Sequence, residues 1–184
     1  MKKNLLLIPL IAFLVLFTST ANSQETTPMT TEAITVNHTG SFEINMTPDD
    51  ALPLFTGPGE ALWVPNWDPV ILNGDGFEKG SVFQTTRDGG TTTWLVLKYD
   101  RNNHHARYMR MMPDYDVGTV DVTLKSNNNG GSVVTVTYQL TALGEDRNKS
   151  LAEWDADAYA DEMLAWRDLI VAADDKIKAH FASR

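Results

Sequence analysis

Cysteine is missing from the sequence, and its absence excludes several kinds of chemistry. The chain can form no disulfide, no thiolate nucleophile and no cysteine-ligated metal site, so its core alone has to stabilise the fold. His-X-His and His-Glu-X-X-His spacings are also missing, as are a Gly-X-Ser-X-Gly turn and a Gly-rich phosphate-binding motif. We therefore predict no metal site, no cofactor and no catalytic residue of a standard motif.

Basic residues are scarce relative to acidic ones. The chain has 15 Lys and Arg residues against 24 Asp and Glu residues, a net charge of −9. Without Lys2 and Lys3, which lie in a segment that we expect to be removed, 13 basic residues remain against 24 acidic ones and the charge is −11. Such a charge disfavours nucleic acids and anionic membrane surfaces as partners, and it also fits plain solubility.

Only one long hydrophobic run occurs, and it lies near the N-terminus. Leu5–Phe17 follows the two lysines, and the small residues Ala21 and Ser23 precede a possible cleavage site before Gln24. The run is shorter than an ordinary membrane-spanning helix. We predict a signal peptide over residues 1–23 and an exported, periplasmic or extracellular protein without stable membrane insertion after cleavage. An uncleaved membrane anchor is the alternative.

The remaining chain is predicted to form a linker and one domain. Residues 24–33 are polar and aperiodic, so we expect a flexible linker there and a single domain over residues 34–184. Thr47 and Pro48 predict the start of a short helix, and residues 60–63 allow a second one. Turn residues without intervening helices then predict an antiparallel meander. The expected strands are Ile34–Met46 (interrupted near Gly40), Val70–Leu72, Gly80–Thr86, Thr91–Tyr99, His104–Met112, Val117–Lys125 and Val133–Leu143.

Alternation in the last two strands predicts one wet and one apolar face of the sheet. The wet face would carry Thr119, Asp121, Thr123, Thr135, Thr137 and Gln139. The apolar face would carry Val120, Val122, Leu124, Val134, Val136, Tyr138 and Leu140. The apolar face needs a cover, and the C-terminal segment can provide it.

The segment Ser150–Phe181 predicts one long amphipathic helix. Apolar residues recur every three or four positions, and neither Gly nor Pro interrupts the run. Ser150 and Glu153 have the spacing of a capping box. We expect this helix to lie on the apolar face of the sheet and Trp166 to pack its ring onto that face. A helix on a curved sheet leaves room for a cavity between them.

Five stretches of the domain carry a family resemblance: Leu54–Pro69, Gly80–Thr85, Thr92–Asp100, Arg107–Leu124 and Val134–Leu143. With the order of elements, they are similar to the START-like superfamily, also called SRPBCC, which has the helix-grip fold of the major birch pollen allergen and the polyketide cyclases. The likeness is to an uncharacterised bacterial branch. It implies an α+β fold in which a seven-stranded curved antiparallel sheet wraps around a long C-terminal helix. Two short helices follow the first strand, and a hydrophobic cavity lies between sheet and long helix.

The resemblance implies a class of function but no common catalytic motif. Members bind lipids, sterols, hormones or polyketides, and some are cyclases, aromatases or hydrolases. Aromatic rings with a few polar groups are typical of apolar ligand sites. The candidate ligand-binding residues are Trp63, Trp67, Phe83, Trp94, Tyr99, Tyr108, Arg110, Tyr138, Tyr159 and Trp166. Core packing is the alternative for any single ring. Trp63 and Trp67 lie in a loop rich in Pro and Gly, and we expect them at the cavity mouth.

Several other residues leave alternatives open. An inward Arg110 would be a buried cation ready for a carboxylate or phosphate, whereas an outward one would be a solvated strand residue. Lys98 has the same ambiguity. Asp116 is expected to be solvated in a turn. A set of methionines could form an adaptable lining or fill the core: Met109, Met111, Met112 and Met163.

Three functions are compatible with these patterns. The first is binding of a hydrophobic or amphipathic small molecule, such as a lipid, sterol, polyketide or aromatic compound. The second is a cyclase-like or hydrolase-like activity that uses cavity residues such as Tyr138, Tyr159, Arg110 or His105, and a perturbed titratable group facing the cavity would favour it. The third is an interaction module, which a cavity below about 300 Å³ would favour.

The export hypothesis predicts a defined N-terminus. Protein isolated from its native host should begin at Gln24 or within a residue or two, because the small residues Ala21 and Ser23 fit the cleavage pattern. N-terminal sequencing measures this directly. Recovery of a chain that retains Met1 in the membrane fraction would contradict the hypothesis.

Overall fold

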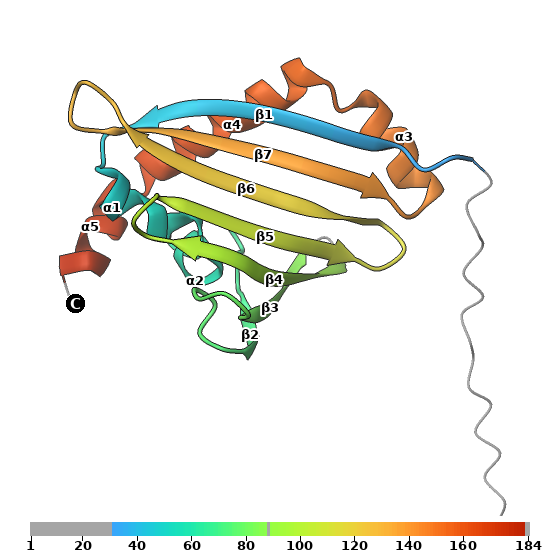
Figure 1. Ribbon diagram of the computed structural model, residues 1–184, viewed down its shortest axis with the longest axis horizontal. Helices are drawn as coiled ribbons and strands as arrows, with labels where there is room; N and C mark the ends of the chain where they lie inside the picture. Colours follow the sequence, from blue (N-terminus) through green and yellow to red (C-terminus); the bar gives the residue numbers. More distant parts are fainter. Residues whose placement is uncertain (1–30, 88, 183–184) are drawn as a thin grey trace, which may run out of the picture.

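The computed structural model describes residues 31–87 and 89–182, and these form one curved sheet with helices on one of its faces (Figure 1). The predicted signal peptide and most of the predicted linker lie outside the described residues. The strands are β1 Thr35–Ile44, β2 Val70–Asn73, β3 Val82–Arg87, β4 Gly90–Asp100, β5 His105–Met112, β6 Asp116–Ser126 and β7 Ser132–Ala142. The helices are α1 Pro48–Ala51, η1 Leu52–Phe55, α2 Gly57–Glu60, α3 Glu145–Glu153, α4 Ala156–Ala172 and α5 Asp174–Ala182. The predicted α+β helix-grip fold is confirmed.

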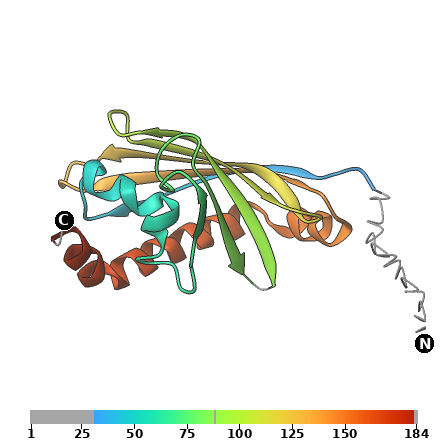
Figure 2. The same cartoon turned by 90° about the horizontal axis from the view of Figure 1, so that it is seen from below.

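The sheet is antiparallel throughout, in the order β1-β7-β6-β5-β4-β3-β2. Consecutive strands pair as a meander from β2 to β7, and β1 returns to pair with β7. β3 and β4 bend towards the helices, so the sheet wraps around them (Figure 2). This bend gives the apolar face the shape of a trough.

Alternation along β6 and β7 divides the two faces of the sheet as predicted. Val122, Leu124, Val134 and Val136 are at most 3% exposed and face the helices. On the other face, hydroxyl groups form cross-strand hydrogen bonds between β1 and β7, such as Thr39 to Thr137 at 2.8 Å. Such pairs stabilise a solvent-facing sheet.

The predicted interruption of the first strand at Gly40 was wrong, because β1 runs unbroken past it and pairs with Val136. Gly40 instead allows a close approach of α4. A Cβ atom at this position would lie 2.7 Å from Met163 Cγ and 3.1 Å from Tyr159 Cε1. The missing side chain therefore lets α4 rest directly on β1.

The C-terminal segment contains a long helix, but its predicted bounds were wrong. Instead of one helix over Ser150–Phe181, the chain forms α3, α4 and α5 in succession. The carboxylate of Asp155 accepts hydrogen bonds from the backbone N–H groups of Asp157 and Ala158, and this cap starts α4. The predicted capping box does not form, because the Ser150 hydroxyl donates to the Arg147 carbonyl inside α3.

The short helices close one end of the trough. Thr47 caps α1 as predicted, with its hydroxyl accepting from Asp50 N. Phe55 of η1 is 1% exposed, and its carbonyl accepts a hydrogen bond of 2.7 Å from the buried Tyr108 hydroxyl. These contacts fix the helical turns against β5.

The described end of the predicted linker is attached to α3. Asn148 Nδ2 donates to Thr31 Oγ1 and to the carbonyl of Glu32, and Asn148 Oδ1 accepts from Ile34 N at 2.8 Å. The side chain of Asn148 thus guides the chain into β1. Among the described residues, no helix has the length and apolar character needed to cross a membrane.

The contact of α4 with β1 predicts a sharp difference between neighbouring residues of that helix. Met163→Ala should lower the free energy of unfolding by about 2–5 kcal/mol, because Met163 is 1% exposed against the sheet. Leu164→Ala, at a residue that is 43% exposed, should change it by less than about 0.5 kcal/mol. Urea denaturation measures both values, and equal losses would contradict this packing.

Candidate functional site

A pocket of about 810 Å³ lies between the inner face of the sheet and α4. We call it the sheet–helix pocket. Its walls come from β3, β4, β5, β7, α3, α4 and the loop after α2. Its inner end continues into a narrow space lined by Glu60, Phe83 and Tyr108 together with rings of the larger pocket.

All five tryptophans of the chain line this pocket: Trp63, Trp67, Trp94, Trp154 and Trp166. Among the ten candidate residues, Arg110 and Tyr138 line it too. Phe83 and Tyr108 lie at its inner end. The structure thus brings eight of the ten candidates together around one space.

Two candidates lie outside the pocket. Tyr159 is 1% exposed and belongs to the core, where its hydroxyl donates to the Val136 carbonyl at 3.0 Å. Tyr99 lines a different hollow, because a bulge between Val96 and Lys98 shifts the alternation of β4. The same bulge pairs Lys98 with Arg107 on the wet face, where Lys98 lies 3.4 Å from Asp100.

Trp63 and Trp67 are fixed by hydrogen bonds to the backbone. Trp63 Nε1 donates to the Leu54 carbonyl at 2.8 Å, and Trp67 Nε1 donates to the Gly57 carbonyl at 2.7 Å. Trp63 is only 4% exposed, so it forms part of the wall rather than the predicted mouth. These bonds hold the Pro- and Gly-rich loop against the pocket.

The rings around the pocket pack against one another in edge-to-face, tilted and stacked pairs, and edge-to-face and offset-stacked pairs are the arrangements that aromatic rings prefer. Trp166 lies 5.4 Å from Trp63 and 6.3 Å from Tyr138 between ring centroids. Trp67 lies 5.8 Å from Trp94. Trp166 therefore packs on Tyr138 of the sheet as expected, and it also lines the pocket.

Arg110 points inward and forms part of a buried charge cluster. Arg110 Nη2 lies 3.1 Å from Asp116 Oδ1, and Arg147 Nε donates to Asp116 Oδ2 at 2.9 Å. The expectation of a solvated Asp116 was wrong, since its side chain is 0% exposed. Asp116 begins β6, and its carboxylate faces inward between β5 and α3. Two guanidinium groups share this one carboxylate, which offsets the cost of burying them.

Glu60 carries a second carboxyl group of the site, and unlike that of Asp116 it has no charged partner in the described part of the chain. It ends α2 and lines both the sheet–helix pocket and its inner end. Among the described residues, its carboxyl group has no hydrogen-bond or ion-pair partner. Burial alone raises its pKa to about 8. A carboxyl group without compensation in an aromatic environment is held in its protonated form at neutral pH.

Tyr138 lies between the two groups of charges. Burial raises its pKa far above the usual value, Arg110 opposes this effect, and Glu60 and Glu162 add to it. Burial also raises the pKa of Glu162 on α4, against a hydrogen bond from Trp154 and the charges of Arg110, Arg147 and Arg87. The pocket therefore has an outer part rich in charges and an inner part with one isolated carboxyl group.

Four charged residues of the site were missed by the sequence reasoning: Glu60, Arg87, Arg147 and Glu162. Glu60 gave a weak signal, because it is one of only two acidic residues, with Asp68, in a loop of aromatic, Pro and Gly residues. Arg147 and Glu162 looked like ordinary polar residues of amphipathic helices. Their role depends on contacts with distant strands, which periodicity does not reveal.

Other candidates point away from the pocket. His105 Nε2 lies 2.9 Å from Asp121 Oδ1 on the wet face, so its possible catalytic role in the cavity finds no support in its position. Of the four methionines, only Met112 lines the pocket. Met111 is 37% exposed and Met163 lies in the core. No group of three His, Asp or Glu side chains in the described ranges is arranged to hold a metal ion.

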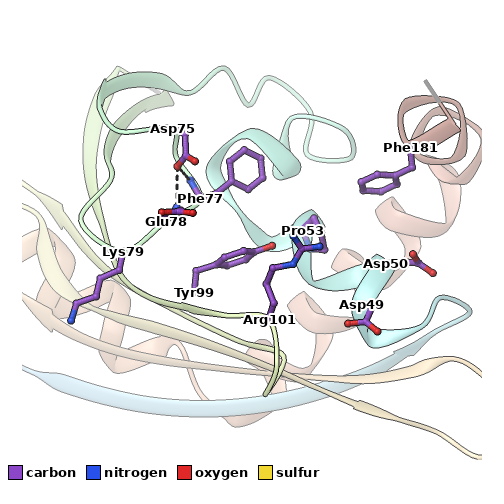
Figure 3. Close-up of a pocket in the computed structure, with 10 residues that line it drawn as sticks. All are labelled: Asp49, Asp50, Pro53, Asp75, Phe77, Glu78, Lys79, Tyr99, Arg101 and Phe181. Atoms are coloured by element: carbon purple, nitrogen blue, oxygen red, sulfur yellow. Dashed lines mark hydrogen bonds between the residues drawn. The ribbon is translucent and has the colours of Figure 1, made fainter. Parts of the chain in front are cut away.

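A second hollow, of about 830 Å³, lies on the outer surface between α1, the β2–β3 loop, the end of β4 and α5 (Figure 3). Its acidic groups have structural roles or face solvent. Asp75 accepts from the backbone N–H groups of Phe77 and Glu78, which together lower its pKa. The Asp49 side chain is 81% exposed. This surface has three aromatic side chains, whereas seven line the sheet–helix pocket, which is the better candidate site.

Comparisons with known proteins agree with this architecture. Residues 35–174 match the family described as polyketide cyclase / dehydrase and lipid transport. No curated protein matches the chain in sequence. Solved structures share the fold at low sequence identity.

Norcoclaurine synthase from Thalictrum flavum in complex with dopamine and hydroxybenzaldehyde has 14% identity and a TM-score of 0.55, over 83% of this chain and 90% of that one. Major latex-like protein 151 from Panax ginseng has 15% identity and a TM-score of 0.54, over 80% and 97%. A protein from Rhizobium leguminosarum has 12% identity and a TM-score of 0.52, over 83% and 98%.

The buried charge cluster predicts that substitution of Asp116 greatly lowers the stability of the fold. Asp116→Asn should lower the free energy of unfolding by about 3–5 kcal/mol, because it leaves Arg110 and Arg147 without their shared carboxylate. Asp114→Asn is the control, since Asp114 is exposed with a φ of 59° that Asn tolerates, and it should cost less than about 0.5 kcal/mol. A loss below about 1 kcal/mol for Asp116→Asn would contradict the cluster's role.

Glu60 predicts a pH-dependent contribution to stability. Because its pKa rises to about 8 on folding, the folded state binds a proton more tightly than the unfolded state. This contribution is present at low pH and is lost as the pH rises from about 5 through about 8. Between pH 5 and pH 9, the free energy of unfolding of Glu60→Gln should rise relative to that of the wild type. The expected rise is at least about 1.4 kcal/mol, the equivalent of one pKa unit.

Denaturation curves at several pH values measure this difference. Glu78→Gln, which changes an exposed carboxyl group, should follow the wild-type pH dependence. Parallel pH profiles of wild type and Glu60→Gln would mean that Glu60 is solvated and not perturbed.

Proposed function

The chain belongs to the polyketide cyclase / dehydrase and lipid transport family, and we propose that it binds a hydrophobic or amphipathic small molecule in the sheet–helix pocket. The observation that carries this proposal is the pocket itself, with five tryptophans around about 810 Å³. Small-molecule sites have volumes of about 300–1,000 Å³ and aromatic walls with a few polar groups. A small molecule fits this space better than a peptide or a nucleic acid does.

Amphipathic character of the ligand is supported by the distribution of polar groups. Rings surround the centre of the pocket, whereas Arg110, Arg147 and Glu162 gather in its outer part. A lipid, sterol, polyketide or aromatic compound with a polar substituent would match both regions. Norcoclaurine synthase, which shares the fold, has been solved in complex with dopamine and hydroxybenzaldehyde.

Export remains part of the proposal. Its support is the N-terminal sequence, in which Lys2 and Lys3 precede the apolar run Leu5–Phe17 and small residues precede Gln24. An exported protein of this kind would take up or carry its ligand in the periplasm or outside the cell.

Catalysis is a second candidate function, and one observation favours it. Glu60 is an isolated carboxyl group with a pKa of about 8 beside the pocket, and such a group is suited to general acid–base chemistry near neutral pH. Tyr138 would be its partner in the pocket wall. A closed interaction module is disfavoured, because the pocket exceeds about 300 Å³.

Filling the pocket tests the binding function. Mass spectrometry of small molecules extracted from natively purified protein identifies a ligand, and a panel of lipids, sterols and aromatic compounds supplies further probes. A bound probe should raise the melting temperature, since it binds only the folded state. Ala165 lies on α4 at the exposed edge of the pocket, so Ala165→Trp should narrow the entrance and weaken binding at least about tenfold, the equivalent of about 1.4 kcal/mol.

Leu164→Trp is the matched control, because the neighbouring Leu164 is 43% exposed and is not part of the pocket wall. It should bind the same probe as wild type does. Equal binding by wild type and Ala165→Trp would locate the ligand elsewhere. If no compound of the panel raises the melting temperature, the binding function itself is contradicted. Conversion of the extracted molecule during incubation with the protein would favour catalysis.

A further inference from the structure

We propose that the sheet–helix pocket binds the positively charged ammonium group of an organic amine at the side lined by Glu60, with the Glu60 carboxylate as its counter-ion. This inference rests on the proposed ligand-binding function and names the class of ligand. It assigns to Glu60 a role in recognition, and it places the cation between this carboxylate and the surrounding rings.

The first argument is that the Glu60 carboxyl group has no partner of its own. Among the described residues, the fully buried carboxylate of the site, Asp116, has two guanidinium partners. The carboxyl group of Glu60 has no hydrogen bond and no ion pair within that part of the chain, although Glu60 lines the pocket. A buried charge without compensation is costly, so a ligand that supplies an opposite charge gains the full interaction.

The second argument is the aromatic surroundings of Glu60. Trp67, Trp94, Tyr138 and Trp166 line both the pocket and its inner end, where Glu60 lies. Aromatic faces attract cations, and quaternary ammonium groups are bound in cages of such rings. The ring of Trp94 already shows this preference, with Arg110 Cζ 5.5 Å from its centroid.

The third argument is that the cations of the pocket do not compete for Glu60. Arg110, Arg147 and Arg87 act on Glu162, whereas burial is the sole cause of the raised pKa of Glu60. On α5, Lys176 Nζ is bound to the Ala61 carbonyl at 2.9 Å. Within the described ranges, no cation of the pocket therefore offsets the negative charge of ionised Glu60, and a ligand with one positive charge would do so.

The other titratable groups that face Glu60 are neutral over the relevant pH range. They are the phenols of Tyr108 on β5 and Tyr138 on β7, whose pKa values burial raises and the charge of Glu60 raises further. Glu162 on α4 lies beyond Tyr138 and interacts with the arginines. Ionisation of Glu60 is thus the change in charge that a bound cation meets.

A pair of probes that differ only in charge tests this inference. Benzyltrimethylammonium carries a fixed positive charge, and neopentylbenzene has the same shape with carbon in place of nitrogen. Calorimetric titration or thermal shift on the full folded protein gives both affinities from pH 6 to pH 9. Because the cation selects ionised Glu60, its affinity should rise by about tenfold per pH unit up to about pH 8 and then level off.

At pH 9 the cation should bind about tenfold or more tightly than the neutral probe. Glu60→Gln should remove both the pH dependence and this preference while it leaves binding of neopentylbenzene unchanged. Glu78→Gln, at an exposed carboxyl group, should behave as wild type. Circular dichroism confirms that both variants are folded.

Four results would overturn the inference, and they separate it from the proposed function. If the neutral probe binds as tightly as the cation at pH 9, or if Glu60→Gln keeps the preference, the ammonium site is wrong and pocket binding stands. If affinity for ligands with hydrogen-bond acceptors falls as pH rises while the cation does not bind, Glu60 acts as a protonated donor instead. If neither probe binds, both the ammonium site and the proposed binding of small aromatic molecules are contradicted.

Discussion

The contact between α4 and β1 is the constraint on which the rest of the structure depends. A helix is a nearly straight cylinder, and the sheet beneath it is a bent trough. At Gly40 the missing side chain lets Met163 and Tyr159 rest on the backbone of β1, so the helix is held close to one wall. Towards β3, β4 and β5 the sheet bends and the surfaces separate (Figure 2). Large aromatic rings fill part of the space between the helix and the sheet, and the unfilled part is the sheet–helix pocket.

This geometry explains why charged groups are buried in the pocket. Along β5 the inward positions are Tyr108 and Arg110, and the trough places Arg110 beside Asp116 at the start of β6. Arg147 reaches the same carboxylate from α3. The cluster connects a helix to two strands at the outer part of the pocket. Glu60 lacks such compensation, which makes it the group most able to respond to a ligand.

Much of the fold could be predicted from local patterns. Turn residues and alternation placed the seven strands, because both signals act over a few neighbouring residues. The break before α4 was missed, although Asp155 is a good N-cap, because the apolar spacing continued across Trp154 and Asp155. The bulge in β4 was also missed, and it decides which face Lys98 and Tyr99 occupy. Periodicity alone does not show where a strand contains an extra residue.

The site was predicted only in its aromatic part. Large rings on inward positions could be assigned from alternation, and eight of the ten candidates do surround one space. Asp116 looked like a turn residue, because its two partners are 6 and 31 positions away in the sequence. Glu60 was overlooked for the same reason, since its isolation depends on rings from β4, β5, β7 and α4. Long-range contacts determine the charge of a buried group, and a single sequence does not display them.

The central claim is that small molecules bind in the sheet–helix pocket, and nuclear magnetic resonance can locate them. All five tryptophans line this pocket, so their indole N–H signals report on it. In a titration with an aromatic hydrocarbon, these signals should shift, while the backbone amides of Phe77 and Arg101 in the outer hollow stay unchanged. Shifts confined to Phe77 and Arg101, or no shifts at all, would contradict the account.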